Sequence, residues 1–225
     1  MRDGVTRLVA PLGGDTSGAV DALLALLEPR LEAAPVAEPL ALLIVSGPPG
    51  AGKSTLARAL APRLGVPYLD RDELKDAMFD ALGWSDRAWS MRVGGVSWDL
   101  MYLFAKRALS TNRNVLLESN FDKRGHPERL PALRSCAEHV LVEVWCRASA
   151  EVLNDRYWRR WDGGGRHPGH VQDTAFARDA LWGDPPNGPP TGVADHLVQV
   201  DTTDPATVNV DAVASHVSEL IEEGP

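Results

Sequence analysis

The sequence has little cysteine and a deficit of positive charge. Its two cysteines, Cys136 and Cys146, stand in neither a CxxC nor a zinc-type spacing, which excludes a disulfide framework and a cysteine-based metal site. Lysine and arginine total 23 against 31 aspartate and glutamate residues, so the net charge is −8. An acidic chain of this kind is a poor candidate for non-specific nucleic-acid binding, although a local basic groove stays open as an alternative.

Long apolar runs are missing as well. No stretch approaches the roughly 20 apolar residues that a membrane-spanning helix requires. Residues 1–11 carry charge but no continuous apolar stretch leading to a cleavage site, which argues against a signal peptide. We therefore expect a cytoplasmic protein without a membrane partner.

Apolar residues occur instead in short runs that alternate with amphipathic segments from residue 40 onward. Strands are expected at 40–46, 66–69, 114–118, 140–146 and 197–201, with helices at 53–64, 72–81, 97–110, 149–161 and 211–222. Continuous apolar strands separated by helices are typical of a parallel sheet covered on both faces. Because parallel crossovers are right-handed, the sequence predicts an α/β fold with a doubly wound five-stranded sheet.

Two segments fall outside this alternation. Residues 1–39 are predicted to be an N-terminal helical extension and linker, which leaves 40–225 as the main domain. The glycine-rich stretch DGGGRHPGH at 162–170 indicates a mobile loop, and we place a lid at about 160–172. Its two histidines, His167 and His170, are expected to be solvated, the alternative being a contact with the substrate.

A phosphate-binding loop comes after the first strand. Residues 47–55 read GPPGAGKST and fit the pattern G-x-x-x-x-G-K-[ST], with an apolar strand immediately before and an amphipathic helix immediately after. The glycines can adopt backbone angles that turn successive amides toward an anion, and the helix N-terminus adds its free amides. Lys53 would neutralise the β- and γ-phosphates, and the Ser54 hydroxyl would complete the coordination of Mg²⁺. The predicted nucleotide-binding residues are Gly47, Pro48, Pro49, Gly50, Ala51, Gly52, Lys53, Ser54 and Thr55.

Motifs further along the chain distinguish the classes of nucleotide-binding protein. The sequence has no N-K-x-D guanine-reading motif, no D-E pair after the third strand and no ABC-type signature. It does have Asp70 and Asp72 directly after the second strand, at the edge where parallel α/β sheets bind their ligands. The alternative is that these carboxylates only cap the next helix, since Asp is a favoured N-cap residue.

In motif order over about residues 40–222, the chain resembles the P-loop small-molecule and polynucleotide 5′-hydroxyl kinases. That family includes shikimate- and gluconate-kinase-like enzymes, chloramphenicol phosphotransferase and zeta-toxin relatives. The resemblance implies a P-loop NTPase fold, ATP as the phosphate donor and Mg²⁺ as cofactor. It places Asp70 in the metal shell, makes Asp72 the general base and gives Lys75 a role in holding the substrate.

The same resemblance implies roles at the ends of later strands. Glu118 would orient Mg²⁺ through water, the alternative being a strand-end carboxylate in solvent. Asn120 would contact the acceptor, and the loop that contains Thr203 would pass the adenine ring.

Arginines gather on the helix and loop of the predicted lid region. Phosphoryl transfer spreads negative charge over equatorial oxygens, and a guanidinium brought in by a closing lid would stabilise it. Arg156 and Arg160 are four residues apart and share a helix face, so we predict catalytic roles for them, whereas Arg159 points away. Arg166 comes after glycines that could act as hinges. The alternative is a solvated basic helix face.

The acceptor is the least determined part of the hypothesis. Trp84, Trp89 and Trp98 fall where related kinases build the acceptor pocket, and they either stack on a ring-bearing substrate or pack in the core. We interpret the chain as a kinase for a hydroxyl of a small molecule such as a sugar, nucleoside or antibiotic-like natural product. The alternatives are a polynucleotide 5′-hydroxyl kinase, which the net acidity disfavours, and a nucleotide-dependent regulatory ATPase or binding module.

Overall fold

The structure is a computed structural model that describes residues 35–121, 126–163, 165–171 and 190–225. The helix expected within residues 1–39 lies outside these ranges. The strands are β1 Ala41–Ser46, β2 Tyr68–Asp70, β3 Val115–Glu118, β4 Val140–Arg147 and β5 His196–Asp201. The helices are α2 Lys53–Leu64, α3 Arg71–Leu82, α4 Arg87–Ser110, α5 His126–Ala132, α6 Ala150–Asp162 and α8 Val210–Glu223, with 3-10 turns η1 Leu133–Ser135 and η2 Pro205–Thr207.

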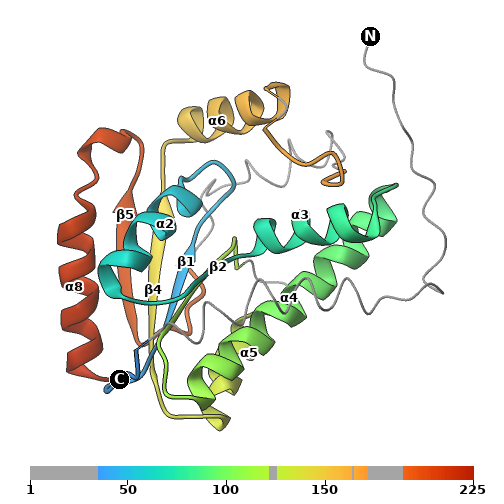
Figure 1. The fold of residues 1–225 in the computed structure, drawn as a ribbon. Coiled ribbons are helices and arrows are strands. Elements are labelled where there is room, and N and C mark those ends of the chain that lie inside the picture. Colours follow the sequence, from blue (N-terminus) through green and yellow to red (C-terminus); the bar gives the residue numbers. More distant parts are fainter. Residues whose placement is uncertain (1–34, 122–125, 164, 172–189) are drawn as a thin grey trace.

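The five strands form one parallel sheet in the order β2-β3-β1-β4-β5. The central strand β1 pairs with β3 on one side and β4 on the other, so the strand order reverses next to it. Helices cover both faces (Figure 1). The predicted doubly wound five-stranded parallel sheet is therefore confirmed.

Alternate residues of β1 supply the two halves of the core. Ala41, Leu43 and Val45 pack with residues of α2 and α8, whereas Leu42 and Ile44 pack with residues of α4 and α5. All five are at most 1% exposed, as expected of a strand buried on both faces. Burying an aliphatic side chain of this kind contributes about 1.5–3 kcal/mol. These two layers hold the carboxyl ends of the strands at one edge, where the candidate site lies.

Helix α4 is longer than predicted, because it begins at Arg87 instead of residue 97. The Asp86 side chain caps it by accepting a hydrogen bond from the Trp89 amide at 2.8 Å. Its buried face continues upstream through Ser90 and Val93, and this packing outweighs the low helix propensity of the two glycines that come next. The short helices α5 and η1, between β3 and β4, were not expected from the sequence.

No helix in the described ranges is both long enough and apolar enough to cross a lipid bilayer.

Candidate active site

The phosphate loop joins β1 to α2 and depends on glycine geometry. Gly47 has a φ of +132°, and a Cβ there would lie 2.2 Å from the Cys146 carbonyl oxygen on β4. Gly52 adopts the left-handed region as the residue preceding α2, and no side chain caps the helix. The first amides of α2 therefore point toward the loop, where an anion would meet both their N–H groups and the positive end of the helix dipole.

Lys53 and Ser54, the first two residues of α2, meet Glu118 at the end of β3. The Ser54 hydroxyl donates to Glu118 Oε2 at 2.7 Å, and Lys53 Nζ lies 3.9 Å from Glu118 Oε1. Lys53 also donates to the Pro48 carbonyl at 3.0 Å. Burial raises the pKa of Glu118 to about 8, and nearby Asp70 adds to this effect while Lys53 opposes it. A cation bound beside this buried carboxyl group would stabilise its charged form. Thr55 is exposed.

Asp70 ends β2 and caps α3. Its Oδ1 accepts hydrogen bonds from the amides of Asp72 (2.7 Å) and Glu73 (3.4 Å), and its Oδ2 accepts one from the Tyr68 hydroxyl (3.1 Å). Asp70 therefore caps α3, whereas Asp72 lies inside the helix as its second residue. Capping does not exclude the predicted contact of Asp70 with Mg²⁺, since a carboxylate oxygen accepts more than one interaction.

The described residues contain no group of three or more His, Cys, Asp or Glu side chains that could hold a metal alone. Magnesium in nucleotide sites usually binds one or two carboxylates, while phosphate oxygens and waters complete its shell. Ser54, Asp70 and Glu118 lie at neighbouring strand and helix ends and offer this kind of oxygen donor set. The residues present therefore fit a magnesium ion that arrives with a nucleotide.

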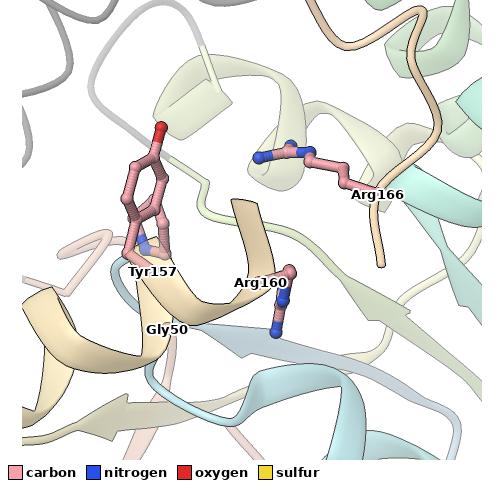
Figure 2. Close-up of a pocket in the computed structure, with 5 residues that line it drawn as sticks. Gly50, Tyr157, Arg160 and Arg166 are labelled. Carbon is pink, nitrogen blue, oxygen red and sulfur yellow. The ribbon is translucent and has the colours of Figure 1, made fainter. Parts of the chain in front are cut away.

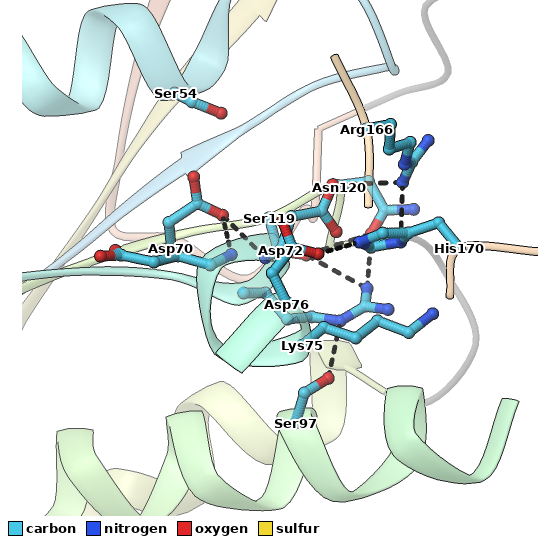
Figure 3. A network of polar contacts seen from close by, with 12 residues as sticks. Ser54, Asp70, Asp72, Lys75, Asp76, Ser97, Ser119, Asn120, Arg166 and His170 are labelled. Carbon is cyan, nitrogen blue, oxygen red and sulfur yellow. Dashed lines mark hydrogen bonds and ion pairs between the residues drawn. The ribbon is translucent and has the colours of Figure 1, made fainter. Parts of the chain in front are cut away.

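Asp72 lies at the start of α3 and pairs with Arg166 (Figure 3). Arg166 Nη2 donates to Asp72 Oδ2 at 3.2 Å, and the Asp72 side chain is 47% exposed. Burial opposes its charge, but the positive charges nearby, that of Arg166 first and those of Arg71 and Lys53 after it, hold the pKa of the carboxyl below its usual value. Asp72 is therefore an ionised, accessible carboxylate.

Around Asp72, further polar side chains connect α3 to α4 and to the end of β3. Arg71 donates to Ser97 at 3.2 Å and to Asn120 Oδ1 at 3.4 Å, and its guanidinium lies 4.5 Å from the Trp98 ring centroid. Lys75 is buried and donates to the Ser90 hydroxyl at 3.1 Å. Burial, together with the charge of Arg71, lowers the pKa of Lys75 to about 8. Predicted substrate residues Lys75 and Asn120 thus lie in one polar cluster with Asp72.

The three tryptophans have different surroundings. Trp98 packs against Tyr102 and Phe121, with ring centroids 6.1 and 5.3 Å away. Trp89 Nε1 donates to the Gly83 carbonyl, whereas Trp84 is 38% exposed. Of the three, Trp98 joins the polar cluster, through Arg71.

Arg156 on α6 connects two loops through their carbonyl groups. It donates to the carbonyl oxygens of Gly50 (3.3 Å), Thr202 (2.8 Å) and Thr203 (3.1 Å). The buried Thr202 hydroxyl adds a hydrogen bond to the Ala51 carbonyl at 2.9 Å. Arg156 therefore holds the segment after β5 against the phosphate loop. The Thr203 side chain accepts a hydrogen bond from the Ser149 amide.

A small recess opens beside the phosphate loop at the end of α6 (Figure 2). Its lining consists of Pro49, Gly50, Tyr157, Arg160 and Arg166. The predicted lid arginine Arg160 thus lies within reach of the loop. Arg159 is 79% exposed and pairs with Asp155 at 2.8 Å, in agreement with its predicted direction.

The histidines were expected to be solvated, and this expectation is wrong. His170 is 5% exposed, and its Nε2 lies 2.5 Å from Asp76 Oδ1 on α3. His167 stacks on Phe79, with ring centroids 5.2 Å apart. Sequence reasoning missed Asp76 and His170 because their contact joins residues 94 positions apart. The only local signal was the pair of histidines around Pro168-Gly169.

Comparison with known proteins shows that this chain is similar in sequence and fold to P-loop kinases. The sequence profile of a family described as an AAA domain (AAA_33) matches residues 42–179. The structure of a candidate kinase from Chloroflexus aurantiacus shares 38% sequence identity, covers 81% of this chain and 98% of its own, and superposes with a TM-score of 0.76. The motif-based resemblance to P-loop kinases is thereby confirmed.

More distant proteins share part of the sequence or the fold alone. The Mycobacterium tuberculosis APS kinase, solved with AMPPNP and APS, shares 18% identity and a TM-score of 0.51 over 81% of this chain and 98% of its own. An uncharacterized protein of the same organism is 26% identical over 155 residues. That match includes 63% of this chain but 30% of the relative, so the chain spans less than a third of the length of this curated relative.

Proposed function

This chain belongs to the AAA_33 family of AAA domains, and we propose that it is an ATP-dependent phosphotransferase acting on a hydroxyl group of a small molecule. Its kinase domain comprises residues 40–225, with a lid at about 160–172. The donor side is the phosphate loop and Lys53. The acceptor side is the carboxyl end of β2 and the start of α3, where Asp72 lies.

The observation that carries the proposal is the state of Asp72. One of its oxygens accepts a hydrogen bond from Arg166, while the other has no hydrogen-bond partner among the described residues. The carboxylate is ionised, half exposed and at the sheet edge that holds the phosphate loop. An ionised, accessible carboxylate at this edge is what proton uptake from a hydroxyl acceptor requires.

In the proposed reaction the acceptor hydroxyl attacks the γ-phosphorus of ATP while Asp72 takes up the hydroxyl proton. The new oxygen–phosphorus bond replaces the bond to the bridging oxygen, and ADP leaves. Lys53 holds the phosphate oxygens, and Arg166 and Arg160 offer positive charge from the lid side. Arg156 keeps the phosphate loop and the loop after β5 in their relative positions.

Magnesium, held by Ser54, Asp70 and Glu118 together with the nucleotide, would supply charge neutralisation at the phosphates. The buried Glu118 supports this assignment, because burial raises the pKa of its carboxyl to about 8 and a cation beside it would stabilise the charged form.

A small acceptor is favoured over a nucleic-acid strand. Strand binding needs a basic track, and the chain has a net charge of −8. The APS kinase that shares the fold was solved with a nucleotide analogue and a small acceptor together, so the fold can accommodate both ligands at once.

The decisive experiment is an acceptor assay with labelled ATP and the variant Asp72→Asn. The panel should hold nucleosides, sugars, hydroxylated natural products and 5′-hydroxyl oligonucleotides. We expect transfer to small compounds, with kcat for Asp72→Asn about 10²–10⁴ lower than for the wild type and ATP affinity nearly unchanged.

The matched control is Glu73→Gln, which removes the same charge from the neighbouring exposed position on α3. It should keep near wild-type turnover. Wild-type kcat in Asp72→Asn would refute the general-base role. Labelling of oligonucleotides alone, lost as salt rises, would show that the acceptor class is wrong.

A further inference from the structure

Four side chains form a continuous chain of contacts from α3 through the 165–171 segment and back to α3 (Figure 3). Asp76 Oδ1 lies 2.5 Å from His170 Nε2. His170 Nδ1 lies 3.3 Å from Arg166 Nη2, and the same Nη2 donates to Asp72 Oδ2 at 3.2 Å. The two ends of this chain are carboxylates one helical turn apart. A histidine and an arginine lie between them.

The direction of each hydrogen bond is set by the chemistry of the groups. Arginine has no acceptor atom, so its contact with His170 requires a lone pair on Nδ1. The ring proton must therefore be on Nε2, where Asp76 accepts it. The contacts thus select one neutral tautomer of His170, and a proton on Nδ1 would face the Arg166 guanidinium.

Arg166 depends on these contacts for its orientation. Its Nε is buried and has no hydrogen-bond partner among the described residues. Its guanidinium reaches both Asp72 and His170 through Nη2. Without His170, a single half-exposed ion pair would have to fix a long and flexible side chain, and such pairs contribute little.

The segment that carries both residues is seated closely on α3. A Cβ at Gly169 would lie 2.6 Å from the Phe79 ring, so only glycine allows this approach. The rings of His167 and His170 both pack on Phe79, and His167 Nε2 lies 3.3 Å from Asp80. His170 is therefore buried at a fixed height above α3, with its two nitrogens directed to different partners.

We propose that His170 is a positioning residue that, in its Nε2–H tautomer, holds the Arg166 guanidinium against Asp72. The role rests on the proposed function, since Asp72 is the base of that reaction. Asp76 selects the tautomer of His170. The Nδ1 lone pair of His170 then accepts a hydrogen bond from Arg166 and keeps this arginine beside Asp72.

The first test reads the tautomer directly and needs no activity. Long-range ¹H–¹⁵N spectra of the labelled full chain near pH 7 report which ring nitrogen of each histidine is protonated, and the His170→Asn variant identifies its signals by their loss. We expect a protonated Nε2 and an unprotonated Nδ1. A protonated Nδ1, or a doubly protonated ring, would overturn the proposal.

A pair of substitutions separates positioning from simple docking of the segment. Asparagine places an amide oxygen near the position of Nδ1 and can still accept from Arg166. Glutamine reaches the position of Nε2 and can still donate to Asp76. If His170 serves Arg166, His170→Asn should retain at least about tenfold more kcat than His170→Gln, with similar KM for ATP in both.

The reverse order, or equal losses, would reduce His170 to an anchor of the segment on α3 and overturn the proposal. His167→Asn is the matched control, because it also removes a ring from Phe79 but lies outside the chain of contacts to Asp72. Failure of the proposed function looks different: the wild type would then transfer phosphate to no acceptor, and the ¹⁵N spectra would still decide the tautomer.

Discussion

The nucleotide end of the candidate site is formed mainly by backbone, whereas the acceptor end is formed mainly by side chains. At the nucleotide end the backbone shapes the site: Gly47 lies against the Cys146 carbonyl, and the uncapped start of α2 points into the loop. At the acceptor end side chains shape it, and the Arg166–Asp72 pair joins residues 94 positions apart. The nucleotide end should therefore tolerate no added atoms at Gly47, and the acceptor end should be sensitive to the loss of charged groups.

The carboxylates of the two ends also differ in their electrostatics. Burial raises the pKa of Glu118 beside the phosphate loop, so its charged form is stable there only with a cation nearby. Asp72 has a pKa below its usual value because nearby cations outweigh its burial. The carboxyl group of Glu118 gains its charge when a cation lies beside it, whereas that of Asp72 is already ionised, so their environments set the two groups apart.

The largest effect is expected from Gly47→Ala, which tests the backbone side of the comparison. Its Cβ would meet the Cys146 carbonyl at 2.2 Å, and a φ of +132° is unfavourable for alanine. We expect a loss of about 3 kcal/mol or more in the free energy of unfolding, together with loss of ATP binding. Urea unfolding and calorimetric titration with ATP measure both.

Gly65→Ala provides the control for that substitution. Gly65 has a φ of +64° but nothing within 4 Å of its missing Cβ, so the backbone strain acts alone. It should cost about 1–2 kcal/mol and leave ATP binding intact. Equal losses in the two variants would mean that the close approach at Gly47 has no effect.

The next effect tests the side-chain end. Arg166→Met keeps much of the apolar volume but removes the guanidinium that contacts Asp72 and His170. We expect kcat to fall by about 10²–10³ while ATP affinity changes little, the usual result of losing one charge-stabilising donor. Steady-state kinetics measure the first and calorimetry the second. Arg159→Met, which removes an exposed arginine paired with Asp155, is the control; a similar loss of kcat there would contradict the assignment.

The same contrast explains what the sequence could predict. The phosphate loop was predictable residue by residue, because its glycines and Lys53 recur at fixed local spacing. The parallel sheet was predictable from apolar strands that need burial on both faces. The chain Asp76–His170–Arg166–Asp72 was not, since nothing local in α3 shows which later segment packs on it. Helix α4 was underestimated because tertiary packing overrides the propensity of its glycines.

A third prediction concerns Lys75 at the acceptor end and the pH dependence of the free energy of unfolding. Burial lowers the pKa of Lys75 to about 8, while a lysine in the unfolded chain titrates near pH 10.4. Between these values the unfolded state binds more protons, so the free energy of unfolding should rise with pH through this window, by about 2 kcal/mol. Urea unfolding of the wild type and Lys75→Met from pH 7.5 to 10.5 measures it. Parallel curves for the two proteins would show that folding does not lower the pKa of Lys75.

The smallest effect concerns Arg156, which belongs to the nucleotide end although it lies on α6. Lysine keeps the charge but cannot contact the carbonyls of Gly50, Thr202 and Thr203 together. We expect Arg156→Lys to weaken ATP binding about tenfold, equivalent to about 1.4 kcal/mol, with a similar change in KM. Arg160→Lys should affect kcat instead. If Arg156→Lys lowered kcat alone, Arg156 would instead act on the transferring phosphoryl group.

The contacts of Arg156 and Thr202 also bear on how the molecule opens. They join the carbonyls of Gly50 and Ala51 to the segment after β5, and Thr202 holds the end of β4 through the Arg147 carbonyl as well. A local fluctuation that frees one of these segments has to release the others. In hydrogen exchange, the amides of the phosphate loop and of residues 202–203 would therefore share one opening free energy and behave as a single cooperative unit. A ligand that touches only the phosphate loop would then slow exchange at both places.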